Sequence, residues 1–143
     1  MRIAMLLDNP LSEDQRVLRE AESLISAGNS VTVYCVKNNF TASEILNGIV
    51  VKRILSEQVF KVRNNNYLNQ KAKEIASNEF DVLHVHDSYM LRLGVRIKKL
   101  KTNVKLIYDS HEMFHEWEIN MPDASLWNRM KAMIVRRWEI IKE

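Results

Sequence analysis

Short apolar runs alternate with amphipathic segments along this chain. Apolar residues at a spacing of three and four predict a helix that starts at Ser12, two helices around 67–76 and 88–100, and a last helix after Pro122–Asp123. The β-branched and aliphatic runs predict five strands, over 2–7, 31–36, 49–55, 81–86 and 104–109.

The alternation of strands and helices predicts an α/β fold over residues 1–143, with βαβ units and a parallel sheet. Right-handed crossovers then give a Rossmann-like, doubly wound sheet. The first and fourth strands are expected side by side at its centre, where the strand order reverses. The polar loops after the first, fourth and fifth strands should gather there, at the edge where open α/β sheets bind ligands.

Several local signals set the expected ends of these elements. Ser12 and Gln15 have capping-box spacing at the start of the first helix, and Gly28 suits its left-handed C-terminal cap. Asp87 or Ser88 is expected to cap the third helix. The segment 41–47 is expected to be a short helix or a loop.

Composition excludes some classes of protein. The net charge of +3, from 21 basic and 18 acidic residues, is too mild to demand a nucleic-acid partner. The single Cys35 lies within an apolar run, which indicates a small buried residue and a reducing compartment. The five apolar residues before Asp8 are too few for a signal peptide or a membrane span, so we expect a cytoplasmic protein.

The candidate chemistry lies in two phrases that close strands, His84-Val85-His86-Asp87 and Tyr108-Asp109-Ser110-His111-Glu112. His84 and His86 alternate along one strand, so both face the same side of the sheet. They could share a metal ion, completed by residues of the second phrase or by His115, or they could simply pack and orient the loop.

His111 follows the fifth strand on the loop side. Its imidazole could donate to a hydroxyl or to developing negative charge, with Asp109 or Glu112 setting its tautomer. The alternative is a histidine that only supports or caps neighbouring groups.

The loop from Asp8 to Ser12 opens onto a helix N-terminus, where free amides favour a phosphate. No pair of glycines allows close backbone approach there, and ordinary capping by Ser12 and Asp14 is the alternative. Residues 127–143 form a basic amphipathic segment with tryptophans, which suits either contact with an anionic membrane or a helix that covers the sheet.

Three motifs in order resemble those of bacterial family 4 glycosyltransferases. The first is Asp14-Gln15-Arg16-Val17-Leu18-Arg19-Glu20-Ala21, followed by Gly28 and the second strand, and the other two are the histidine phrases. The resemblance implies the N-terminal, acceptor-side half of a GT-B architecture. It implies sugar transfer from a nucleotide-sugar to an acceptor hydroxyl, with retention and with neither a bound metal nor a further cofactor.

The resemblance also implies roles for single residues. His111 would lie beside the transferred sugar as the catalytic residue. Arg16 and the loop residues Asp8, Asn9 and Ser12 would lie near the donor phosphates. The acceptor side would be lined by His86, Asp87 and Glu112, and Asp109 is counted with these binding residues.

By the same resemblance, the chain is expected to be an incomplete N-terminal domain that lacks its donor-binding partner domain and is inactive alone. The whole enzyme would be hexosyltransferase-like and would act on a glycan or lipid-linked acceptor of the cell surface. Membrane contact through residues 127–143 would place it at the inner membrane face, and an uncovered last helix would favour a homo-oligomer.

Two other classes of function remain open at this stage. One is a metal-dependent hydrolase built on His84, His86, Asp109 and His111. The other is a non-catalytic α/β binding module. A receiver-like version of the module would need an acidic cluster after the first strand and a lysine after the fifth, and the sequence has neither.

Overall fold

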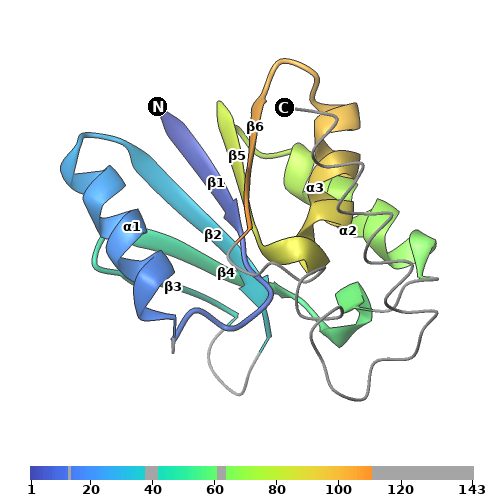
Figure 1. Ribbon diagram of the computed structural model, residues 1–143, viewed down its shortest axis with the longest axis horizontal. Coiled ribbons are helices and arrows are strands. Elements are labelled where there is room, and N and C mark those ends of the chain that lie inside the picture. The colour runs from blue at the N-terminus through green and yellow to red at the C-terminus, as the bar shows by residue number, and fades with distance from the viewer. Residues whose placement is uncertain (13, 38–41, 61–63, 111–143) are drawn as a thin grey trace, which may run out of the picture. The chain divides into compact units, whose positions relative to one another are not determined.

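A computed structural model describes residues 1–12, 14–37, 42–60 and 64–110 (Figure 1). The chain divides into two units, Met1–Ser110 and His111–Glu143. The second unit lies wholly outside the described residues. The predicted positions of His111, Glu112, His115 and the last helix therefore lie outside them too.

The elements are β1 (Arg2–Leu6), α1 (Gln15–Ser26), β2 (Ser30–Val36), β3 (Ser43–Leu46), β4 (Ile49–Leu55), α2 (Asn65–Ala76), β5 (Val82–His86), α3 (Asp87–Leu100) and β6 (Lys105–Asp109). The described chain forms a sheet of six strands in the order β3-β4-β2-β1-β5-β6. Every neighbouring pair is parallel except β3 with β4. Helix α1 covers one face, and α2 and α3 cover the other (Figure 1). A short 3-10 helix, η1 (Glu57–Phe60), follows the fourth strand.

This arrangement confirms the predicted doubly wound, Rossmann-like sheet. Strands β1 and β5 lie side by side at its centre, and the strand order reverses between them. The central strand β1 is buried on both faces: Ala4 and Leu6 belong to the core under α2 and α3, and Ile3 and Met5 to the core under α1. Because both faces of a parallel sheet are covered, such strands read as continuous apolar runs.

Residues 43–46 form a strand, so the prediction of a helix or loop for this segment is wrong. β3 pairs antiparallel with β4 through a two-residue connection, Asn47-Gly48. Both residues have positive φ, 50° for Asn47 and 85° for Gly48. A type I′ hairpin turn requires this backbone, and Asn-Gly is its preferred sequence.

The predicted cap of the first helix is also wrong. The helix begins after Asp14, whose carboxylate accepts from the Val17 N–H at 3.1 Å, and Ser12 is exposed. The loop turns at Leu11, with φ of 70° and its N–H bonded to Asn9 Oδ1 at 2.8 Å. This turn places Ser12 before the first helical turn.

The two other predicted helix ends had different outcomes. Gly28 is confirmed as the left-handed cap of α1, with φ of 81°. Its N–H bonds to Ile25 O, and that of Asn29 bonds to Leu24 O, which is a Schellman motif. Helix α3 already begins at Asp87, with His86 in the cap position and no side-chain cap bond, so neither Asp87 nor Ser88 caps it.

Cys35 is buried, and burial raises the pKa of its thiol to about 12, as suits a small core residue. Among the described helices, none combines the length and apolar character that a membrane crossing requires.

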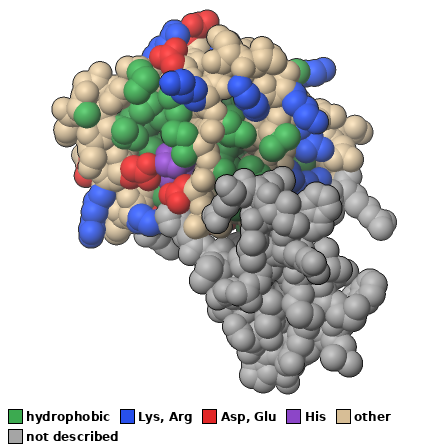
Figure 2. All heavy atoms as spheres, turned by 45° about the horizontal axis from the view of Figure 1, so that its top comes forward, with side chains coloured by type: hydrophobic (Ala, Val, Ile, Leu, Met, Phe, Trp, Pro, Cys, Tyr) green, Lys and Arg blue, Asp and Glu red, His purple; other side chains and the backbone are tan. Residues whose placement is uncertain are grey.

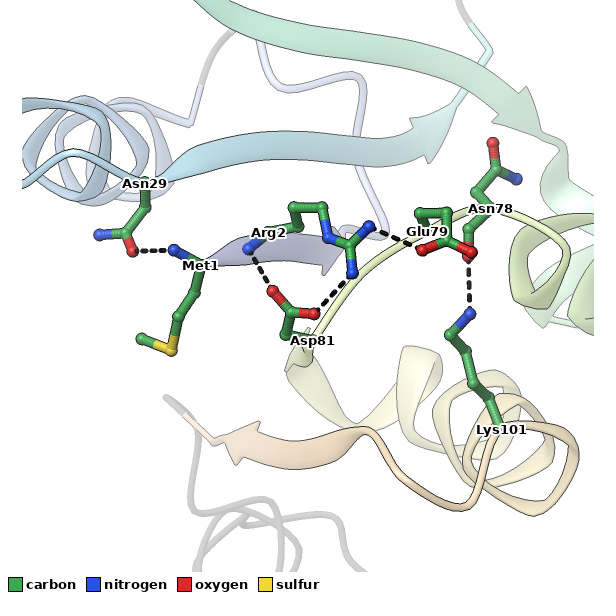
Figure 3. Close-up of polar contacts among 7 residues, drawn as sticks. All are labelled: Met1, Arg2, Asn29, Asn78, Glu79, Asp81 and Lys101. Atoms are coloured by element: carbon green, nitrogen blue, oxygen red, sulfur yellow. Dashed lines mark hydrogen bonds and ion pairs between the residues drawn. The ribbon is translucent and has the colours of Figure 1, made fainter.

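Figure 3 shows the polar contacts that join the chain at the amino edge of the sheet. Asp81 accepts from the Arg2 backbone N–H at 2.8 Å and from its guanidinium at 2.9 Å, and the same guanidinium bonds to Glu79 at 2.7 Å. On the other side of this loop, Lys101 Nζ donates to the Asn78 carbonyl at 3.0 Å. These contacts hold the start of β1 and the end of α3 to the loop before β5.

We expect the Arg2–Asp81 contact to make stability sensitive to acid. The Arg2 side chain and backbone N–H lower the pKa of Asp81 to about 2, from an ordinary value of 3.8. The contact therefore contributes fully above about pH 4, and its contribution is lost as the pH falls toward about 2. In Asp81→Asn, urea unfolding should show a shallower loss of stability over this interval. The exposed Glu57→Gln is the control, and equal pH slopes in the two variants would contradict the assignment.

We expect Gly94→Ala to destabilise the fold. A Cβ at this position of α3 would lie 2.6 Å from Val85 Cγ2, which belongs to the core between α3 and β5. Such overpacking costs about 1–3 kcal/mol, partly offset by about 1 kcal/mol of helix propensity gained over glycine.

A double-mutant cycle in denaturant checks this contact. Gly94→Ala should lower the free energy of unfolding less in the Val85→Ala background than in the wild type. The reason is that Val85→Ala removes the Cγ2 methyl group that the new Cβ would meet. Simple additivity of the two substitutions would show that the helix does not approach the strand this closely.

Candidate functional site

The described site residues meet at the carboxyl edge of the sheet, on the face that α1 covers. His84 and His86 stand at alternate positions of β5, and their ring centroids are 4.2 Å apart. The residue between them, Val85, faces the opposite core. In the register of the parallel pair, Asp109 at the end of β6 lies beside His86. The predicted common face of the two histidines is confirmed.

Helix α1 contributes two charged side chains one turn apart, Arg16 and Glu20. Residues at this spacing share one helix face. Glu20 Oε1 lies 3.0 Å from His84 Nδ1, and Arg16 Nη1 lies 3.9 Å from Asp109 Oδ2. Helix α1 therefore contributes one charge toward β5 and one toward β6.

Asp109 lies at the centre of this arrangement. Its Oδ2 is 3.8 Å from His86 Nδ1 and 3.9 Å from His84 Nε2, in addition to its contact with Arg16. We call Glu20, His84, His86 and Asp109 the His–carboxylate cluster; one potential ligand atom from each lies within 4.8 Å of all the others. Figure 2 shows a histidine between acidic side chains, beside a hydrophobic patch.

The two histidines differ in burial. His86 is fully buried, and His84 is 8% exposed. Burial is the largest cause that lowers the pKa of His86, to about 4, and the nearby His84 and Arg16 lower it further while Asp14 opposes them. His86 is therefore uncharged at neutral pH and can offer a nitrogen lone pair.

The loop after β1 has a more structural role than the sequence suggested. Asn9 donates to the Asp14 carboxylate at 2.9 Å and accepts from the Leu11 N–H, so its side chain stabilises the loop itself. Arg16 Nη2 lies 3.8 Å from Asp14, which links this loop to the cluster. Asp8 stands partly exposed after β1, and Ser12 is exposed.

Asp87 occupies the junction of β5 and α3 with a φ of 64°, a backbone conformation uncommon outside glycine. Of the predicted site residues, the structure brings together Arg16, His86 and Asp109. His111 and Glu112 lie outside the described residues.

Sequence reasoning missed Glu20 as a member of the site. The spacing of Arg16 and Glu20 could have indicated it, because it places both charges on the same face of the helix. On the face that covers a sheet, each charge needs a polar partner from the sheet. Its contact with His84 joins two segments far apart in the sequence.

Two comparisons with known proteins bear on the family and the fold of this chain. The sequence profile of Glycosyltransferase Family 4 matches residues 15–141. The fold is similar to the solved structure of sucrose-phosphate synthase from Thermosynechococcus elongatus, with a TM-score of 0.64 and 12% sequence identity, over 91% of this chain. No curated protein matches the chain.

This chain covers 39% of the length of that synthase chain. At 12% identity the likeness shows the fold alone, which is the Rossmann-like half of a GT-B architecture. The family profile spans most of the sequence and includes Arg16, Glu20, both histidines of β5 and Asp109. The chain belongs to glycosyltransferase family 4.

Proposed function

We propose that this chain is the acceptor-side domain of an enzyme that transfers a sugar from a nucleotide-sugar to an acceptor hydroxyl. The proposed product is a glycan or lipid-linked glycan of a bacterial cell surface, formed with retention of configuration. Family membership supports the general class, and favours it over a metal-dependent hydrolase or a binding module. The observation that carries the proposal is the convergence of Arg16, His86 and Asp109 at the carboxyl edge.

In the proposed reaction, the acceptor oxygen bonds to the anomeric carbon of the sugar. The bond from that carbon to the leaving phosphate oxygen breaks, and the nucleoside diphosphate departs with the electron pair and takes up the hydroxyl proton. Negative charge grows on the leaving group, so cations and aligned amides nearby stabilise the transition state. Most of this stabilisation is assigned to a donor-binding domain.

The residues of this chain would receive the acceptor and orient the sugar. Arg16 is 41% exposed and offers a cation to phosphate oxygens. Asp109 is about one-third exposed, and its carboxylate can accept a hydrogen bond from a sugar hydroxyl. His86 and Asp87 would border the acceptor side. His111, two residues after Asp109, would lie beside the transferred sugar and donate to developing negative charge.

We also propose a cytoplasmic location, with contact at the inner membrane face through residues 127–143. The proposed membrane contact is supported by the basic amphipathic pattern of residues 127–143 and by their tryptophans. Self-association into a homo-oligomer through this segment belongs to the same proposal, and nucleic acid is not among the expected partners.

His111→Ala should lower turnover without comparable loss of nucleotide binding. In an enzyme that joins this chain to a donor-binding domain, loss of a group active only in the transition state should reduce kcat by about 10²–10⁴-fold. Steady-state kinetics with isothermal titration of the nucleotide measure both effects. His115→Ala is the matched control, and an unchanged kcat in His111→Ala would refute the assignment.

Arg16→Ala should weaken the donor more than the acceptor. Loss of one charge-assisted contact to phosphate corresponds to about 1.5–3 kcal/mol, which is about 10–150-fold in the KM of the nucleotide-sugar at 1.4 kcal/mol per tenfold. Arg19→Ala, on the same helix, is the control. An effect confined to the acceptor KM would instead place Arg16 on the acceptor side.

A further inference from the structure

The His–carboxylate cluster holds more metal-binding groups than the proposed transfer uses. Two imidazoles and two carboxylates from β5, β6 and α1 point their nitrogen and oxygen atoms at one small volume. Imidazole with carboxylate is a ligand set that suits zinc and neighbouring transition metals rather than magnesium or calcium.

The distances within the cluster approach those of a metal site. Asp109 Oδ2 lies 3.8 Å from His86 Nδ1 and 3.9 Å from His84 Nε2. Bonds of about 2.0–2.2 Å in tetrahedral geometry place ligand atoms about 3.3 Å apart. Each separation is therefore only about half an ångström too long, within the reach of a small side-chain rotation.

Glu20 supplies the supporting contact that such a site needs. Its Oε1 lies 3.0 Å from His84 Nδ1, so a proton on that nitrogen can be donated to the carboxylate. The other ring nitrogen, Nε2, then presents its lone pair on the side of Asp109. A ligand histidine held by a carboxylate through its second nitrogen is a recurrent arrangement in metal proteins.

The site is both positioned and accessible. His84 and His86 are held on a buried strand with 8% and 0% exposure, so their relative position is fixed by the sheet. Asp109 and Glu20 are about one-third exposed and leave a route for an ion from solvent. The competing cation is Arg16, 3.9 Å from the same Asp109 oxygen; it also lies 3.8 Å from Asp14 and can pair there instead.

From these contacts we propose that the cluster binds one divalent transition-metal ion. His84 Nε2, His86 Nδ1 and Asp109 Oδ2 are the ligands, and Glu20 positions His84. Three protein ligands leave at least one position open for water or a substrate oxygen. The site differs from the one expected from sequence, because Glu20 supports it and it is complete without His111. The site shares His86 and Asp109 with the proposed acceptor side. Its test measures Zn²⁺ binding and not sugar transfer, so either proposal can fail without the other.

The test is equilibrium dialysis of the chelator-stripped chain against Zn²⁺ with Mg²⁺ in excess, followed by elemental analysis. We expect one Zn²⁺ per chain. His84→Ala and Asp109→Asn should abolish stoichiometric binding, and Glu20→Gln should weaken it by about 10–100-fold. Arg16→Ala should tighten it, because removal of a competing cation frees Asp109.

Two matched controls locate the ion. Glu22→Gln, on the same helix as Glu20, and His115→Ala should leave binding unchanged. Circular dichroism checks that each variant is folded. A direct measurement needs no variant: one equivalent of Zn²⁺ should shift the imidazole NMR resonances of His84 and His86 and leave that of His115 in place.

Two results would overturn the proposal. One is the absence of stoichiometric Zn²⁺ with unshifted His84 and His86 resonances. The other is binding that survives Asp109→Asn but is lost in His115→Ala, which would assign the ion to the C-terminal histidines.

Discussion

The alternation of side chains along β5 is the constraint on which the rest of the structure depends. Leu83 and Val85 must fill the core under α2 and α3, so His84 and His86 are forced onto the opposite face, under α1. A slip of one residue would bury the imidazoles in an apolar core and place the aliphatic residues beside the charged side chains of α1. Gly94 lets α3 pack closely against Val85 on this face of β5.

The polar residues on the α1 face compensate one another. Glu20 stands against His84, and Arg16 stands against Asp109, so each charge from the helix meets an opposite or polar group from the sheet. The two imidazoles are buried, and buried polar groups are costly without such partners. The arrangement is compatible with an ion between the histidines and Asp109, since Arg16 has Asp14 as a second partner.

The two edges of the sheet hold different kinds of polar residue. At the amino edge, Arg2 is hydrogen-bonded to Asp81 and Glu79, and these contacts hold β1 to the loop before β5. At the carboxyl edge, the strand ends carry the histidines and Asp109. The contacts that stabilise the amino edge are therefore distinct from the histidines and Asp109, which stand at the edge where open α/β sheets bind ligands.

The sequence by itself determined the parallel sheet, the central position of β1 and β5, the cap at Gly28 and the common face of His84 and His86. These follow from local periodicity and from the handedness of crossovers. The sequence also contained the Asn47-Gly48 hairpin signal. The edge strand β3 before it is only partly buried, so its composition does not stand out as that of a strand. Only the tertiary structure decided that Asp14 rather than Ser12 caps α1, and that Glu20 contacts His84. The cap depends on how the loop turns at Leu11. The contact between Glu20 and His84 depends on how α1 packs across a strand that is distant in the sequence. Neither of these produces a periodic pattern in the sequence.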